Sequence, residues 1–101
     1  MWSHRLRSAL LVALYLSALL LAGCAVTAPV QEMSDARQAL RAAEQAGAPE
    51  RALPAYQQAL DLLDSAEVLL QAGEYRRARD KAELSRAHSL EARQQAIELS
   101  R

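Results

Sequence analysis

Few residues in this sequence could do covalent or proton-transfer chemistry. Cys24 is the only cysteine, and it ends an apolar run in the stretch LLLAGCAVTAP. Its thiol could be a redox group, a metal ligand, a small buried side chain or a point of covalent attachment. With no second cysteine, an intramolecular disulfide is impossible. The segment around Cys24 therefore decides what the thiol does.

The second candidate for chemistry is His88, which has Ser85 and Glu91 three residues to either side. On a helix this spacing could suggest a proton relay, but it is also typical of a solvated face with ion-pair neighbours, which we favour. The sequence has no His-x3-His pair, and its carboxylates are scattered singly among arginines. We therefore expect no catalytic residue, no metal site, no cofactor and no small-molecule substrate, and we predict that the chain is not an enzyme.

The first 23 residues have the plan of a secretory signal. Arg5 and Arg7 precede an apolar stretch over residues 9–22, which is followed by small residues. A membrane-spanning helix needs about 20 apolar residues, so this run of roughly 14 is short for a span. We therefore expect residues 1–23 to be removed.

The end of this run, Leu21-Ala22-Gly23-Cys24, resembles the bacterial lipobox. The resemblance implies cleavage before Cys24, a diacylglyceryl group on its sulfur and acylation of the new amino terminus. Two or three acyl chains make a lasting membrane anchor. Ala25 follows the cysteine where Asp would imply retention at the inner membrane, so we expect an outer-membrane protein facing the periplasm of a diderm host. A buried thiol after an ordinary signal peptide remains the alternative.

The residues that remain after cleavage are nearly balanced in charge. The whole chain has 12 basic and 12 acidic residues, and loss of Arg5 and Arg7 leaves ten basic against twelve acidic. This balance argues against nucleic acid as a partner. We assign residues 24–32 to a tether and residues 33–101 to one small domain with a thin core.

The domain is predicted to be all-α. From Gln31 onward, Ala, Leu, Glu, Gln and Arg dominate, and Val68 and Ile97 are the only β-branched residues. Gly and Pro residues interrupt the helical pattern between residues 47 and 54 and again at Gly73. Three helices follow, at about 31–46, 54–72 and 74–100. The start of the first could lie at Pro29 or Ser34.

The last two helices are predicted to form a long antiparallel hairpin. Residues 74–100 carry a stripe of mostly small side chains that fits against the leucine-rich stripe of residues 54–72. The stripe consists of Tyr75, Ala78, Ala82, Ser85, Ser89, Ala92, Ala96 and Leu99. Folding at Gly73 would bring Glu67 near Arg79, and Asp61 or Asp64 near Arg86. The run RRARDK, residues 76–81, is read as the start of an amphipathic helix whose charges pair with residues 54–72 and with Asp80 and Glu83. Contact with anionic lipid headgroups is the alternative.

The segment LLDSAEVLLQAGEYRRARDKA resembles one tetratricopeptide-like helical hairpin, with Ala66, Ala78 and Ala82 at small positions and Gly73 and Tyr75 in the turn. The domain as a whole is similar to the domain of unknown function 4398 of Gram-negative envelope lipoproteins. The segments ARQALRAAEQAGAPE and LPAYQQALDLLDSAEVLLQAGEYRRARDKAELS and the Ala-rich end carry this similarity. It implies a helical periplasmic domain and no established activity.

These observations predict a non-enzymatic, lipid-anchored module that binds or scaffolds an envelope protein. Tyr56, Tyr75, Ile97 and Leu99 are the candidate partner contacts, although the two tyrosines also suit the ends of the hairpin core. The alternative is a structural lipoprotein that self-associates through the Ala-rich stripe. The helix breaks at residues 47–54 and at Gly73 weigh against this alternative, and sedimentation of the soluble domain distinguishes the two.

Overall fold

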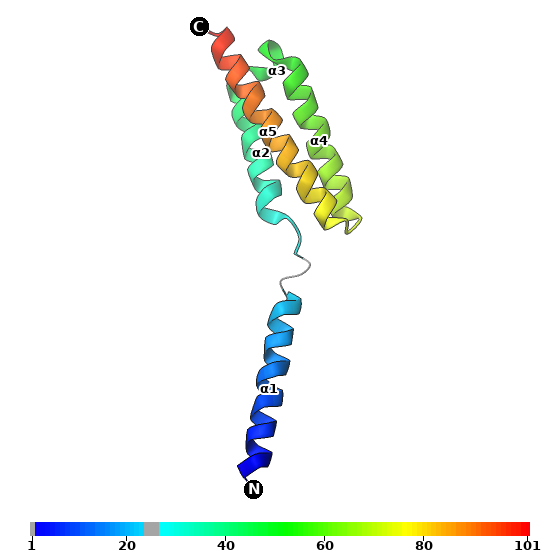
Figure 1. Cartoon of the computed structure of the whole chain (residues 1–101). Helices are drawn as coiled ribbons and strands as arrows, with labels where there is room; N and C mark the ends of the chain where they lie inside the picture. Colours follow the sequence, from blue (N-terminus) through cyan, green and yellow to red (C-terminus); the bar gives the residue numbers. More distant parts are fainter. Residues whose placement is uncertain (1, 24–26) are drawn as a thin grey trace.

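The computed structural model describes residues 2–23 and 27–101, and these residues are almost entirely helical. The predicted all-α class is confirmed, but the described residues form five helices where the sequence predicted three and an apolar leader (Figure 1). The helices are α1 (Trp2–Gly23), α2 (Val30–Gln45), α3 (Ala48–Arg51), α4 (Leu53–Gln71) and α5 (Tyr75–Leu99).

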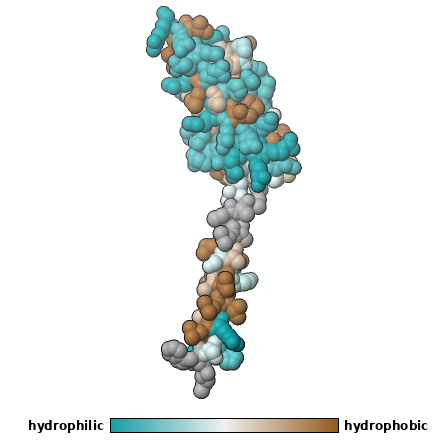
Figure 2. Space-filling view, in the orientation of Figure 1, coloured by the Kyte–Doolittle hydropathy of each residue, from teal (hydrophilic) through white to brown (hydrophobic). Residues whose placement is uncertain are grey.

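Helix α1 is the apolar N-terminal segment, and among the described residues it contacts none of the other helices. Its large apolar side chains from Leu6 to Leu20 are exposed, and Figure 2 shows hydrophobic residues gathered along it. None of the helices in the described part of the chain combines the length and apolar character needed to cross a membrane. An exposed apolar surface of this kind is typical of a segment that contacts a membrane or another protein.

Helices α2, α4 and α5 form the bundle, with α5 packed against both of the others. Close packing follows from the inner face of α5, where every buried residue is alanine or serine and the helix backbones can approach one another. These buried residues are Ala78, Ala82, Ser85, Ser89, Ala92 and Ala96. The predicted stripe is thus confirmed over its central six positions, whereas Tyr75 is half-buried and Leu99 is exposed.

The two buried serines of this inner face, Ser85 and Ser89, differ in their hydrogen bonding. The Ser85 hydroxyl donates a hydrogen bond to the Ala59 carbonyl of α4 over 2.7 Å. Ser89 is also fully buried, but its hydroxyl has no partner among the described atoms. Ser85 therefore links α5 to α4 by a specific bond, while Ser89 mainly supplies small size.

The core is divided into two clusters along the bundle. The first lies toward the start of α2 and contains the larger side chains, with Met33, Leu40 and Leu63 packed against alanines of α2, α4 and α5. The second lies toward the end of α2 and consists of buried alanines only, namely Ala43, Ala48, Ala52, Ala55, Ala92 and Ala96. Apolar volume is therefore concentrated in the first cluster.

The predicted helix ends are close to the observed ones at both glycine turns and differ at α3 and at the start of α2. Gly47 and Gly73 adopt the left-handed conformation after α2 and α4, with φ of 86° and 77°, which a residue without Cβ reaches at little cost. However, the predicted break contains the single turn α3, because burial of Ala48 and Ala52 holds it against the bundle. Helix α2 already begins at Val30, within the residues assigned to the tether.

The predicted pairing of Glu67 with Arg79 is wrong. Glu67 Oε1 lies 3.4 Å from Arg37 Nη2 of α2, and Arg79 Nε lies 3.3 Å from Glu32 Oε1, also of α2. Arg86 forms no ion pair with Asp61 or Asp64 within the described residues. The prediction considered only the hairpin, whereas α2 packs beside both of its helices and supplies nearer partners of opposite charge.

Candidate functional site

The predicted cleavage and attachment residues lie at the end of α1. Leu21, Ala22 and Gly23 belong to its last turn, whereas Cys24 lies outside the described residues. The described chain resumes at Thr27, only three residues after the cysteine. Any group attached to Cys24 is therefore close in sequence to the start of the bundle.

The start of the bundle is joined to the beginning of α5. Arg79 Nη2 donates a hydrogen bond to the Thr27 carbonyl oxygen over 3.3 Å, and its Nε pairs with Glu32. Pro29 is among the most deeply buried side chains. The α4–α5 turn and the point where the chain enters the bundle thus lie at the same end of the domain, as Figure 1 shows. We call this end the tether end.

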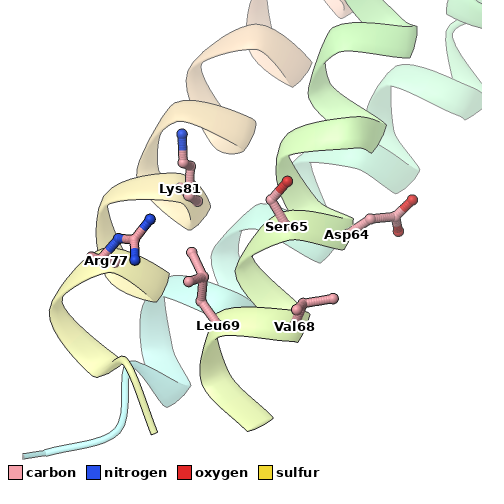
Figure 3. Close-up of a pocket in the computed structure, with 6 residues that line it drawn as sticks. All are labelled: Asp64, Ser65, Val68, Leu69, Arg77 and Lys81. Atoms are coloured by element: carbon pink, nitrogen blue, oxygen red, sulfur yellow. The ribbon is translucent and has the colours of Figure 1, made fainter. Parts of the chain in front are cut away.

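A groove of about 420 Å³ opens between α4 and α5 near the tether end. We call it the basic groove, because two cationic side chains of α5 line it opposite an apolar strip of α4. Its lining consists of Asp64, Ser65, Val68, Leu69, Arg77 and Lys81 (Figure 3). Sequence reasoning missed this groove; the available signals were Val68, which lies off the buried stripe, and the i, i+4 spacing of Arg77 and Lys81.

The candidate partner residues are not brought together. Tyr56 and Tyr75 stand at the first turns of two antiparallel helices, and therefore at opposite ends of the hairpin. Ile97 is half-buried and Leu99 is 68% exposed near the end of α5. Of the four residues, Leu99 offers the most surface to another molecule.

Tyr56 is instead engaged within its own chain. Its ring packs against both core clusters, and its hydroxyl donates a hydrogen bond to Glu44 Oε1 over 2.9 Å. Burial raises the pKa of Tyr56 above its ordinary value, and the hydrogen bond to Glu44 and the negative charges of Glu44 and Glu50 raise it further. Tyr56 therefore stays neutral and serves as a packing residue with one satisfied polar group.

Replacement of Glu44 by glutamine should lower the pKa of Tyr56, because it removes a negative charge and a charged acceptor while burial remains. The change is measured by ultraviolet titration of tyrosinate in a Tyr15→Phe, Tyr75→Phe background. Since the folded-state pKa is raised, the associated stability is present below the pKa of unfolded tyrosine and is lost as pH rises through the folded-state value. Glu98→Gln is the control, and an unchanged Tyr56 pKa in Glu44→Gln would contradict the assignment.

The His88 group does not form a relay. His88 Nδ1 lies 3.2 Å from Glu91 Oε2 on the helix surface, but the Ser85 hydroxyl points to the Ala59 carbonyl of α4. No cluster of three or more His, Cys, Asp or Glu side chains suited to a metal ion occurs in the part of the chain that the structure describes. The geometry at His88 is that of a surface pair three residues apart.

Comparison with known families identifies the bundle. A family model described as Domain of unknown function (DUF4398) matches residues 31–100, which is more than half of the chain. The chain belongs to this family. Its DUF4398 domain begins in the first turn of α2 and extends through α5, so it coincides with the helical bundle. No curated protein and no solved structure matches the chain.

Proposed function

We propose that this protein is a lipid-anchored envelope protein whose DUF4398 domain binds or scaffolds another envelope protein and has no catalytic role. The observation that carries the proposal is the Leu21-Ala22-Gly23-Cys24 motif, whose first three residues end the apolar helix α1 and whose cysteine comes a few residues before the bundle in sequence. The exposed apolar surface of α1, preceded by Arg5 and Arg7, supports its role as a signal segment. Acyl chains on Cys24 would then hold the bundle at the membrane after α1 is removed.

The proposed location is the outer membrane, with the domain facing the periplasm. Ala25 after the cysteine supports this choice, because the lipoprotein resemblance associates inner-membrane retention with Asp at that position. The few residues between Cys24 and Pro29 keep the domain close to the bilayer, since an extended chain spans at most about 3.3–3.6 Å per residue. A binding partner would therefore be met near the membrane surface.

We favour binding or scaffolding over catalysis because the outer faces of the bundle helices are available for contact with another protein. The α4–α5 hairpin supports the proposed likeness to a single tetratricopeptide-like hairpin: Ala66, Ala78 and Ala82 are fully buried at its contact, and Gly73 forms its turn. One hairpin lacks the tandem groove of a repeat array. We therefore propose that the partner contacts an outer helix face, with Leu99 and Ile97 as the candidate contacts.

Self-association through the Ala-rich stripe is the weaker alternative. The six central residues of the stripe are buried against α2 and α4 of the same chain. A second copy could reach them only if the bundle opened. A self-associating form of this protein would have to use another surface.

The anchor is tested by replacing Cys24 with serine in cells of a diderm bacterium. The unmodified protein should fractionate with the outer membrane, and mass spectrometry should find an N-terminal acylated Cys24 peptide and no residues 1–23. Cys24→Ser should retain residues 1–23 and lose the acyl mass completely, because the sulfur is the attachment atom. Ala28→Ser, four residues further on, is the matched control and should be processed normally. A Met-initiated, lipid-free chain in the cytosol would refute the proposal.

A further inference from the structure

The basic groove combines an opening, two cationic side chains and an apolar strip. Val68 is 67% exposed although it is a branched apolar residue, and Leu69 beside it is half-buried. Arg77 and Lys81, one turn apart on α5, line the other wall of the groove, with the Arg77 side chain directed toward Leu69 (Figure 3). A ligand that suits the groove therefore carries negative charge next to an apolar part.

The charges of the groove favour an anion. Every ion pair shorter than 4.0 Å in the described residues involves other groups, so neither Arg77 nor Lys81 has a carboxylate partner there. Arg79, which lies between them in sequence, is by contrast occupied by Glu32 and Thr27. Asp64 is the one acid of the lining, and its side chain extends away from α5 in Figure 3. Two like charges four residues apart repel each other, and an anion between them would relieve this repulsion.

The position of the groove indicates where the anion comes from. The groove lies near the tether end, where Arg79 bonds to Thr27, three residues from Cys24. An extended chain of three residues spans about 10 Å. With acyl chains on Cys24, Arg77 and Lys81 would lie within reach of the phosphate layer of the bilayer.

We propose that the basic groove binds the headgroup of an anionic phospholipid, with the phosphate between Arg77 and Lys81 and the glycerol and upper acyl chain against Val68 and Leu69. The inference rests on the proposed lipid anchor and adds to it a defined orientation: the tether end of the bundle faces the membrane. A volume of about 420 Å³ falls in the range of small-ligand sites, about 300–1,000 Å³. Arginine and lysine are the side chains that commonly bind phosphate.

Lys81 provides the measurement, because it is the only lysine of the chain. The acylated mature protein, carrying Arg93→Lys, is reconstituted in phosphatidylcholine vesicles with or without phosphatidylglycerol. Both amines are labelled with an uncharged, membrane-impermeant amine reagent and located by peptide mass spectrometry. Labelling of Lys81 relative to position 93 should slow about fivefold with phosphatidylglycerol, the magnitude expected for one basic residue at an anionic surface. Raising the salt concentration should reverse part of this protection.

Two arginine variants distinguish headgroup binding in the groove from non-specific attraction of the domain to the anionic membrane surface. Arg77→Gln should lose most of the protection of Lys81, whereas Arg86→Gln, further along the same helix, should keep it. Equal labelling in both kinds of vesicle, or equal loss in both variants, would overturn the inference. Detection of the acyl group on Cys24 in the same digest distinguishes the proposals: an acylated chain with unprotected Lys81 overturns only the headgroup site. A chain without lipid overturns the anchor and the headgroup site together.

Discussion

Replacement of Met33 by alanine is expected to lower the free energy of unfolding of the DUF4398 domain by about 2–5 kcal/mol. Met33 is 1% exposed and is among the largest fully buried side chains of the described chain. It fills the first core cluster between α2 and the leucine-bearing face of α4. Truncation there removes apolar contacts and leaves a cavity in a closely packed core, which relaxes only partly around it.

This loss is large relative to the stability of so small a domain. At about 0.05–0.15 kcal/mol per residue, a domain of this length has a total of only about 3–10 kcal/mol. The measurement is urea unfolding of the mature protein, followed by circular dichroism. Val30→Ala, on the same helix but 72% exposed, should change the stability by no more than about 0.5 kcal/mol. Similar midpoints for Met33→Ala and the unmodified protein would show that the first cluster is not the main source of stability.

Ala82→Leu is expected to destabilise the bundle by about 1–3 kcal/mol or to prevent its folding. Ala82 is fully buried in the first cluster on the inner face of α5. The small side chains of that face let the helix backbones approach closely, so a leucine would have to separate them. The expected observation is a lower melting temperature, or an expanded helical state with exposed apolar surface that binds a hydrophobic dye.

The control for this prediction is Ala87→Leu, on the exposed side of the same helix. Alanine and leucine are both strong helix formers, so the two variants differ mainly in what the new side chain meets. Ala87→Leu should melt within a few degrees of the unmodified protein. An equal effect at positions 82 and 87 would rule out close packing as the cause.

The three long helices of the bundle and the inner face of α5 could be predicted from sequence, because both depend on local patterns, whereas the single turn α3 was not predicted. Gly47 and Gly73 mark the ends of α2 and α4, and small residues recur on α5 at helical spacing. Other alanines were harder to assign. Ala36 and Ala55 are buried whereas Ala72 and Ala87 are exposed, and alanine fits either environment because it is small and only weakly hydrophobic.

Features that depend on how three helices come together were not predictable from the hairpin alone. The position of α2 determines that Arg79 pairs with Glu32 rather than with Glu67. The basic groove also requires the register of α4 against α5, since Val68 and Arg77 come from different helices. The attachment motif at Cys24 does not depend on helix packing, because it is recognised as a short linear sequence. It stays a prediction from sequence, since Cys24 lies outside the described residues.

The alanine and serine face of α5 has a consequence for how so short a chain stays folded. Alanine has no side-chain rotamers to lose, and serine has few, so ordering this face costs little conformational entropy. A leucine-rich helix would bury more apolar area but would also lose more side-chain conformational entropy on folding. In the second core cluster every buried residue is alanine, so folding there costs the least side-chain conformational entropy. The cluster is held together by the close approach of the helix backbones.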